Sequence, residues 1–193
     1  MRSFLSHQLR PAIGLVVVMT VLTGLVYPGA VTAVAQVAFP SQANGSMLVA
    51  GGRSVGSVLI GQSFTDPRYL WPRPSVAGPD GYDAMASGGS NLGPTNRALI
   101  DAVARRVAGL RAANGDGPVP VDLVTASASG LDPDVSPAAA EYQVARIASA
   151  RGVAPDTIRA AIARHTGGRA LGFLGEEHVN VLEVNLDLDG LLR

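Results

Sequence analysis

The sequence predicts one N-terminal transmembrane helix followed by a single mixed α/β domain in which helices cover a small sheet. Three observations predict this fold class. Residues 11–52 contain no charged side chain, although 16% of the 193 residues are charged. Residues 95–165 place apolar side chains at helical spacing between capping residues and glycines. Residues 182–189 alternate apolar and polar side chains, which is typical of a strand with one wet face.

The composition excludes several classes of chemistry. The chain has no cysteine, and all 15 of its basic residues are arginines. Without cysteine there are no disulfides and no zinc sites built on sulfur. Without lysine there is no P-loop and no Schiff base. The net charge of zero argues against a general nucleic-acid binder, which needs a basic face. We therefore expect no nucleic-acid partner, no resident metal and no catalytic residue.

The uncharged stretch predicts where the membrane lies. Residues 12–27 would span roughly 24 Å as a helix, which is short of a bilayer core of about 30 Å. Continuing to residue 38 lengthens the helix to about 40 Å, with a kink near Pro28. We expect residues 1–10 to be cytoplasmic, residues 11–38 to form the transmembrane helix and residues 39–193 to form an extracytoplasmic domain.

The charges that flank the span predict its orientation. Arg2 and Arg10 precede it, and no charge follows until Arg53. The positive-inside rule therefore places the N-terminus in the cytoplasm of a single-pass protein of the cell membrane. A cleavable signal peptide ending near residues 33–35 is the alternative. Both interpretations export the C-terminal part.

One face of the predicted span carries small residues. Thr20, Thr23 and Gly24 lie three and four positions apart, so they share one side of a helix. Such a face packs closely on partner helices. The alternative is a helix side that simply contacts membrane lipid.

The domain begins with little helical periodicity. Residues 57–61 predict a strand, and residues 67–94 predict a long ordered loop, because Tyr69, Trp71 and Tyr82 concentrate aromatic side chains there.

Helices follow in the second half of the chain. The first is expected to begin at Thr95 or Asn96 and to end by Gly115. The second has Ser136 as its N-cap, with Pro137 at its first position, and stops at residue 152. The third should occupy residues 155–165, and further strands should lie at residues 119–125 and 182–189.

Two other functional classes deserve a place as alternatives. A membrane-anchored or secreted hydrolase would need a serine (Ser90, Ser127 or Ser129) together with His165 or His178. Around Ser90, however, the nucleophile motif G-x-S-x-G fails, because its fifth position is Leu92. His165 also falls at the end of a predicted helix, where a cation is favourable without any catalytic role.

Residues 144–164 match a helix-turn-helix, the signature of a membrane-anchored DNA binder. Its reading helix would carry only Arg159 and Arg164, and a helix hairpin packed on a sheet gives the same pattern. The acidic pair Asp187 and Asp189 is expected on one face of the last strand, as a solvated edge or, alternatively, a metal site.

The most informative loop precedes the first helix of the domain. Adjacent glycines let a backbone approach a ligand closely, hydroxyl and amide side chains add donors, and a following helix N-terminus favours an anion. The alternative is a tight loop stabilised by its own side chains. The residues of this loop are Ser87, Gly88, Gly89, Ser90 and Asn91.

Ordered sequence blocks along almost the whole chain carry a family resemblance. They include YP at 27–28, FP at 39–40, QANGS at 42–46, RPS at 73–75, SGGSNLGPTN at 87–96, VDLVTASASGLD at 121–132, GFLGE at 172–176 and VNV at 179–181. With these blocks the chain resembles the potassium-transporting ATPase C chain family (KdpC). One departure is Asp134, where the resemblance leads us to expect a histidine.

The resemblance implies membership of a multisubunit, ATP-driven potassium importer. Its partners would be a pore-like potassium-binding subunit and a P-type ATPase subunit, and potassium would be the transported ion. This chain would be a non-catalytic helper for assembly and stability. It has no Asp-Lys-Thr-Gly phosphorylation loop, since it has no lysine, and no potassium-filter loop.

The resemblance also implies a second role, that of a catalytic chaperone that raises the ATP affinity of the ATPase subunit. Residues 87–91 would then bind the nucleotide, because they resemble the LSGGQ signature of ABC transporters. This role conflicts with the orientation expected from the flanking charges, since ATP is cytoplasmic.

Overall fold

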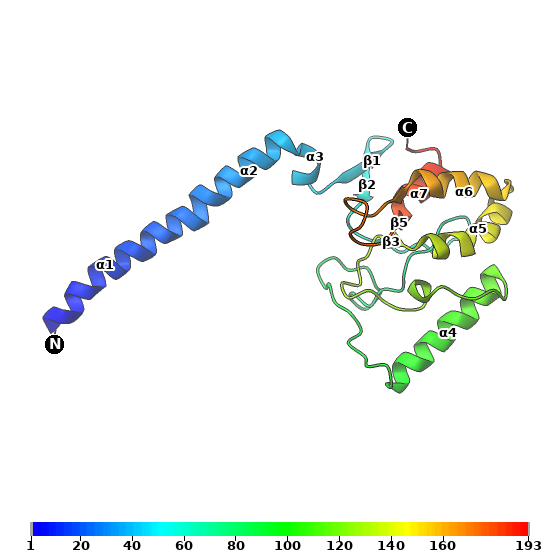
Figure 1. Ribbon diagram of the computed structural model, residues 1–193, viewed down its shortest axis with the longest axis horizontal. Helices are drawn as coiled ribbons and strands as arrows, with labels where there is room; N and C mark the ends of the chain where they lie inside the picture. Colours follow the sequence, from blue (N-terminus) through cyan, green and yellow to red (C-terminus); the bar gives the residue numbers. More distant parts are fainter. Residues whose placement is uncertain (1, 193) are drawn as a thin grey trace. The chain divides into compact units, whose positions relative to one another are not determined.

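The computed structural model describes residues 2–192. Contacts divide the chain into two compact units, which meet between Met47 and Leu48. The first unit is a helical segment, and the second is a mixed α/β domain (Figure 1). The predicted fold class, one apolar N-terminal helix before a domain of helices and small sheets, is confirmed.

The first unit is one long helix with an irregular turn. Helix α1 (Arg2–Val21) passes through a π-helical turn, η1 (Leu22–Val26), into α2 (Tyr27–Ala38). The apolar part, His7–Ala38, is long enough to span a membrane. The irregular turn precedes Pro28, whose ring displaces the carbonyl four residues earlier and whose nitrogen donates no hydrogen bond. The short helix α3 (Pro40–Ala43) follows.

The domain opens with a two-stranded hairpin. Strands β1 (Met47–Ala50) and β2 (Arg53–Ser57) are joined by Gly51 and Gly52, both at positive φ, as a tight hairpin turn requires. The predicted strand at 57–61 is wrong beyond its first residue. Ser57 Oγ accepts a hydrogen bond from the Leu59 amide, and this local contact turns the chain instead of extending it.

A second predicted strand, at residues 119–125, is also wrong. After α4 (Arg97–Asn114), the chain forms a 3₁₀ turn, η2 (Val121–Leu123). Pro120 precedes the turn, and the Thr125 hydroxyl donates back to the Val121 carbonyl. The alternating apolar residues therefore do not extend along a sheet. Leu123 and Val124 instead enter the core side by side.

The next two helices confirm the predicted boundaries. Helix α5 (Pro137–Arg151) is capped by Ser136, whose hydroxyl accepts from the Ala139 amide, and it ends at Gly152 in the left-handed conformation. Helix α6 (Pro155–Arg164) packs against α5, and His165 is its C-cap.

The main sheet consists of three short strands. Strands β3 (Asp134–Val135), β4 (Thr166–Gly167) and β5 (His178–Asn180) form an antiparallel sheet in the order β3-β5-β4. Val179 lies opposite Val135 on one side and Thr166 on the other. The helices α5 and α7 contact β5, so helices cover a small sheet, as predicted.

The last predicted strand, residues 182–189, is wrong because the segment is helix α7 (Val181–Leu188). Asn180 caps this helix by accepting from the Glu183 amide. Helix α7 is buried on several sides, so its apolar residues do not form a single stripe at helical spacing. Its alternation therefore imitates a strand.

Candidate functional site

The long loop before α4 is held by side-chain amides from two helices. The Leu70 amide donates to Asn185 Oδ1 at 2.7 Å, and Asn185 Nδ2 donates to the Leu70 carbonyl at 3.0 Å. Gln143 makes the same pair with the backbone of Trp71, at 2.8 and 3.1 Å. The backbone N–H and C=O groups of Leu70 and Trp71 thus bond to side-chain amides in the way that they would bond to a neighbouring strand. These bonds hold residues 70 and 71 of the loop that the sequence predicts at residues 67–94.

A buried arginine joins this loop to the helices. Arg146 of α5 donates to the carbonyls of Pro67 and Tyr69 at 2.6 and 3.0 Å, and to Gln143 Oε1 at 2.6 Å. Its guanidinium stacks 3.8 Å from the ring centre of Trp71. Burial lowers the pKa of Arg146 to about 10, so it remains charged near neutrality.

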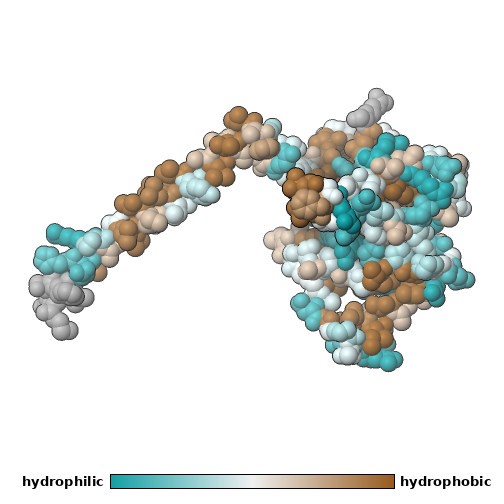
Figure 2. Space-filling view, in the orientation of Figure 1, coloured by the Kyte–Doolittle hydropathy of each residue, from teal (hydrophilic) through white to brown (hydrophobic). Residues whose placement is uncertain are grey.

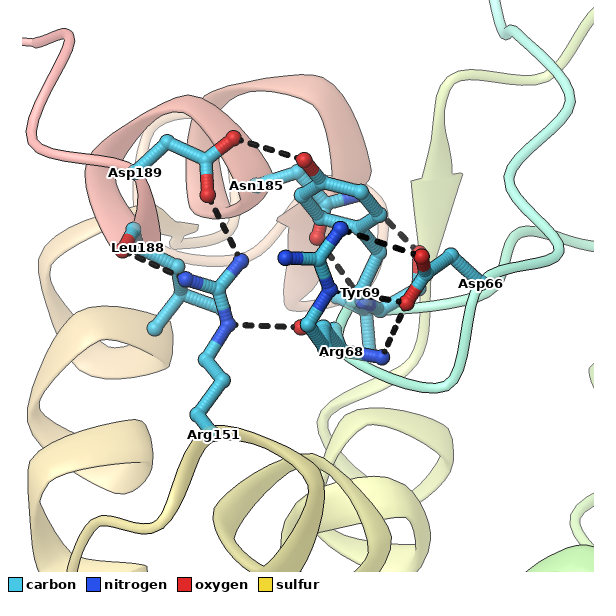
Figure 3. A network of polar contacts seen from close by, with 8 residues as sticks. Asp66, Arg68, Tyr69, Arg151, Asn185, Leu188 and Asp189 are labelled. Atoms are coloured by element: carbon cyan, nitrogen blue, oxygen red, sulfur yellow. Dashed lines mark hydrogen bonds and ion pairs between the residues drawn. The ribbon is translucent and has the colours of Figure 1, made fainter.

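A second network fastens the same loop to the end of α7 (Figure 3). Arg151 donates to the carbonyls of Arg68 and Leu188, both at 2.7 Å, and to Asp189 at 2.8 Å. The Tyr69 hydroxyl donates to the other oxygen of Asp189 at 2.8 Å, and this bond raises the pKa of the tyrosine.

The two carboxylates expected on one strand face therefore separate. Asp189 contacts the loop, whereas Asp187 accepts from Arg164 and lies 3.0 Å from His165 Nε2. The expectation of a shared strand edge was wrong, since α7 is a helix. Within residues 2–192 no cluster of histidine and acidic side chains has a geometry that could hold a metal.

The residues of the hydrolase alternative do not come together. His165 lies 3.6 Å from Glu183 through Nδ1, and His178 Nδ1 lies 3.1 Å from the Glu176 carbonyl. Among the described side chains, no hydrogen bond joins Ser90, Ser127 or Ser129 to either histidine. Ser127 and Ser129 instead accept from backbone amides of their own turn.

The helix-turn-helix alternative finds its arginines already engaged. Arg159 pairs with Glu141 and Asp156, and Arg164 pairs with Asp187. The helix pair α5 and α6 packs as a hairpin, with Ile158, Ala161 and Ile162 buried. This packing accounts for the pattern without DNA.

The glycine-rich loop at residues 87–91 lies against the turn at residues 127–130. The Gly88 amide donates to the Ser129 carbonyl at 2.8 Å, and the Ser87 hydroxyl donates to the same oxygen at 3.1 Å. A Cβ at Gly89 would lie 3.1 Å from the Ala128 carbonyl, so glycine permits this close approach. Ser90 and Asn91 are exposed.

Helix α4, which follows this loop, already carries its own cap, because the Ala98 amide donates to Asn96 Oδ1 at 2.9 Å. The loop at residues 87–91 is therefore held by the turn at residues 127–130, and also by one of its own side chains, because the Leu92 amide donates to Ser90 Oγ at 3.5 Å. Nucleotide binding by residues 87–91 remains a prediction from the resemblance.

The small-residue face of the long helix is exposed along the first unit. Thr23 Oγ1 donates to the Met19 carbonyl at 2.6 Å, which satisfies its hydroxyl within the helix. A Cβ at Gly24 would meet nothing within 4 Å. Thr20 is exposed as well. Packing of this face on partner helices remains a prediction.

An apolar hairpin tip between β4 and β5 was not foreseen. Ala170 and Leu174 form an isolated bridge, and the side chains of Leu171, Phe173 and Leu174 are 82%, 69% and 50% exposed. Figure 2 shows a hydrophobic patch over this loop. The sequence signal is a short apolar run interrupted by Gly172 and Gly175, which turn the chain at positive φ.

Comparison with known proteins shows which family the chain belongs to. The model of the family described as K+-transporting ATPase, c chain, matches residues 9–190. The potassium-transporting ATPase KdpC subunit of Sorangium cellulosum is 61% identical over 188 residues, covering 96% of this chain and 98% of that one. The subunit of the same name from Variovorax paradoxus is 57% identical, covering 96% and 97% of the two chains.

An apolar helix of membrane-spanning length followed by a small α/β domain is the arrangement typical of a membrane protein with a single anchor. More particularly, the chain belongs to the KdpC family, the c chains of K+-transporting ATPases. The resemblance seen in the sequence is thereby confirmed.

The hydrogen bonds between the side chain of Asn185 and the backbone of Leu70 yield a stability prediction. Asn185→Asp removes the donor to the Leu70 carbonyl and places a carboxylate in the core, so we expect the free energy of unfolding to fall by about 3 kcal/mol. Urea unfolding followed by the fluorescence of Trp71 measures the change. The matched exposed variant Asn91→Asp should stay within about 0.5 kcal/mol of the parent. Equal losses from both variants would contradict the assigned role of Asn185.

Proposed function

We propose that this chain is a non-catalytic subunit that assembles and stabilises an ATP-driven potassium importer. The observation that carries the proposal is its membership of the K+-transporting ATPase c-chain family over residues 9–190. The absence of lysine supports the non-catalytic part, because the phosphorylation loop of P-type pumps requires one. Its partners would be a pore-like potassium-binding subunit and a P-type ATPase subunit.

The long helix would anchor the chain in the cell membrane. Residues 7–38 form a helix of about 48 Å, which exceeds a hydrocarbon core of about 30 Å. Arg2 and Arg10 precede the uncharged stretch that begins at residue 11, and the next charge is Arg53. This charge asymmetry supports a cytoplasmic N-terminus and an extracytoplasmic domain.

Orientation can be tested directly in cells. Alkaline phosphatase fused after residue 193 should be active, because the enzyme gains activity only outside the cytoplasm. The same enzyme fused after residue 10 should stay inactive and serves as the matched control. Activity of a cytoplasmic reporter such as β-galactosidase at residue 193 would overturn the proposed topology.

Assembly would begin in the membrane through the small-residue face at Thr20, Thr23 and Gly24. Without a hydrophobic driving force between lipid-embedded helices, close approach at small residues supplies much of the attraction. The exposure of all three residues supports this role.

Two glycine substitutions distinguish a specific role of this face from the general effect of adding a large side chain to the helix. Gly24→Leu should reduce recovery of the other subunits with this chain at least about fivefold, because the new side chain holds the partner helix away. Gly14→Leu is the matched control, since a Cβ there also meets nothing within 4 Å. Co-purification from solubilised membranes gives the measurement. If Gly24→Leu assembles as well as Gly14→Leu, the face does not dock.

The domain would make a second contact through the hairpin tip. Large apolar side chains exposed together mark interaction sites, and Leu171 also holds a φ of +54°, a conformation unfavourable for leucine. Both features cost free energy in the isolated chain. A partner surface that covers the tip would offset that cost.

The hairpin gives a test in which stability and assembly move in opposite directions. Leu171→Gly should leave the domain as stable or stabilise it by about 1 kcal/mol, since glycine accepts a positive φ. Combined with Phe173→Ser, it should lower potassium-stimulated ATP hydrolysis and subunit recovery. Met85→Ser, at a residue 97% exposed, is the control that should change neither. Unchanged assembly in the double variant would exclude the tip.

A further inference from the structure

A cavity of about 520 Å³ lies between α4 and the loop at residues 63–82. This volume falls within the range of small-molecule sites, which are mostly apolar with a few well-placed polar groups. We propose that the cavity binds a small organic anion with an apolar body. The proposal goes beyond the assembly role, because neither the helix face nor the hairpin tip lines this cavity.

One part of the cavity wall is apolar and already rigid. Phe64, Trp71, Leu110 and Leu123 contribute to it. Trp71 is fixed on several sides, because its backbone pairs with Gln143, its Nε1 donates to the Asp66 carbonyl at 2.9 Å and the Arg146 guanidinium stacks on its ring. Binding a ligand against this wall would therefore cost little free energy for ordering its side chains.

Two guanidinium groups line the same cavity, and only one of them is paired with a carboxylate. Arg73 is neutralised by Asp132, with Nη1 and Oδ2 2.7 Å apart. Arg106 of α4 donates one hydrogen bond, from Nη1 to the Val124 carbonyl at 2.9 Å. Among the described residues no carboxylate forms an ion pair with Arg106, so its charge is left uncompensated.

The half-buried position of Arg106 strengthens its attraction for an anion. Burial, and then the neighbouring Arg105, lower the pKa of Arg106, which marks a cation that has lost solvent without gaining an acid. Charge-assisted hydrogen bonds are strong where water is partly excluded. Asp80, the acid that lines the cavity, is exposed to solvent, where water and salt screen it.

This distribution of charge selects the class of ligand. One uncompensated guanidinium matches a single carboxylate or sulfonate, which it can bind through two hydrogen bonds. A bare inorganic anion would leave the wall of aromatic and aliphatic side chains unused. A polyphosphate would bring more charge than the cavity compensates. An aryl or acyl group that carries one acid satisfies both parts of the site.

The only tryptophan of the chain reports on this cavity. We would titrate the full chain in lipid nanodiscs with 4-phenylbutyrate and follow Trp71 fluorescence. The neutral 4-phenylbutanamide has the same shape and partitions into lipid without the charge. We expect a saturable signal with the anion and at least about tenfold weaker binding of the amide, the ratio for one charge-assisted contact. Equal affinities would overturn the proposal, as would no saturable signal.

Variants of α4 test the location without disturbing the core. Gly109 lines the cavity, and a Cβ there meets nothing within 4 Å, so Gly109→Leu fills the site while favouring the helix. It should abolish the signal, whereas Ala108→Leu, at the exposed neighbour, should keep it. Arg106→Gln should weaken binding about tenfold, and the exposed Arg105→Gln should leave it unchanged within about twofold. Binding that survives Gly109→Leu would place the ligand elsewhere.

Discussion

The guanidinium of Arg146 fixes the path of the loop at residues 67–71 against helix α5. It lies buried among carbonyl oxygens and on the ring of Trp71, with no carboxylate among its hydrogen-bond partners in the described chain. A cation in such a place is costly unless every donor is satisfied. The carbonyls of Pro67 and Tyr69 offset part of that cost, which favours the observed arrangement of residues 67–71.

The side-chain amides of Gln143 and Asn185 hold the same loop as Arg146, through the backbone of residues 70 and 71. A loop without strand partners must satisfy its buried backbone groups in another way, and here two helices supply side chains that imitate a neighbouring strand. This substitution explains how so small a sheet suffices for the domain. It also fixes the wall of the Arg106 cavity, since Trp71 belongs to both.

Local signals made part of this fold predictable. Helices α5 and α6 were predicted because Ser136, Pro137 and Gly152 act through neighbours a few residues away. Helix α7 was mistaken for a strand because its burial on several sides depends on packing against α6 and β5, which the spacing of its own residues does not reveal. The sites divide in the same way. The loop at residues 87–91 could be located from its glycines, whereas the cavity could not be predicted, because Trp71, Arg106 and Leu123 meet only through tertiary packing.

The π-helical turn at Leu22–Val26 falls near the middle of the apolar stretch from residue 7 to residue 38. Such a turn holds one more residue than an α-helical turn, and that residue rotates the remainder of the helix by about 100° relative to an unbroken spiral. Side chains in the two halves of the helix therefore point in different directions around its axis from those that a continuous α-helix would give them. The N-terminal and C-terminal halves of one helix can in this way offer different faces to neighbouring helices. A helical wheel drawn through the whole segment would misassign the faces of its C-terminal half.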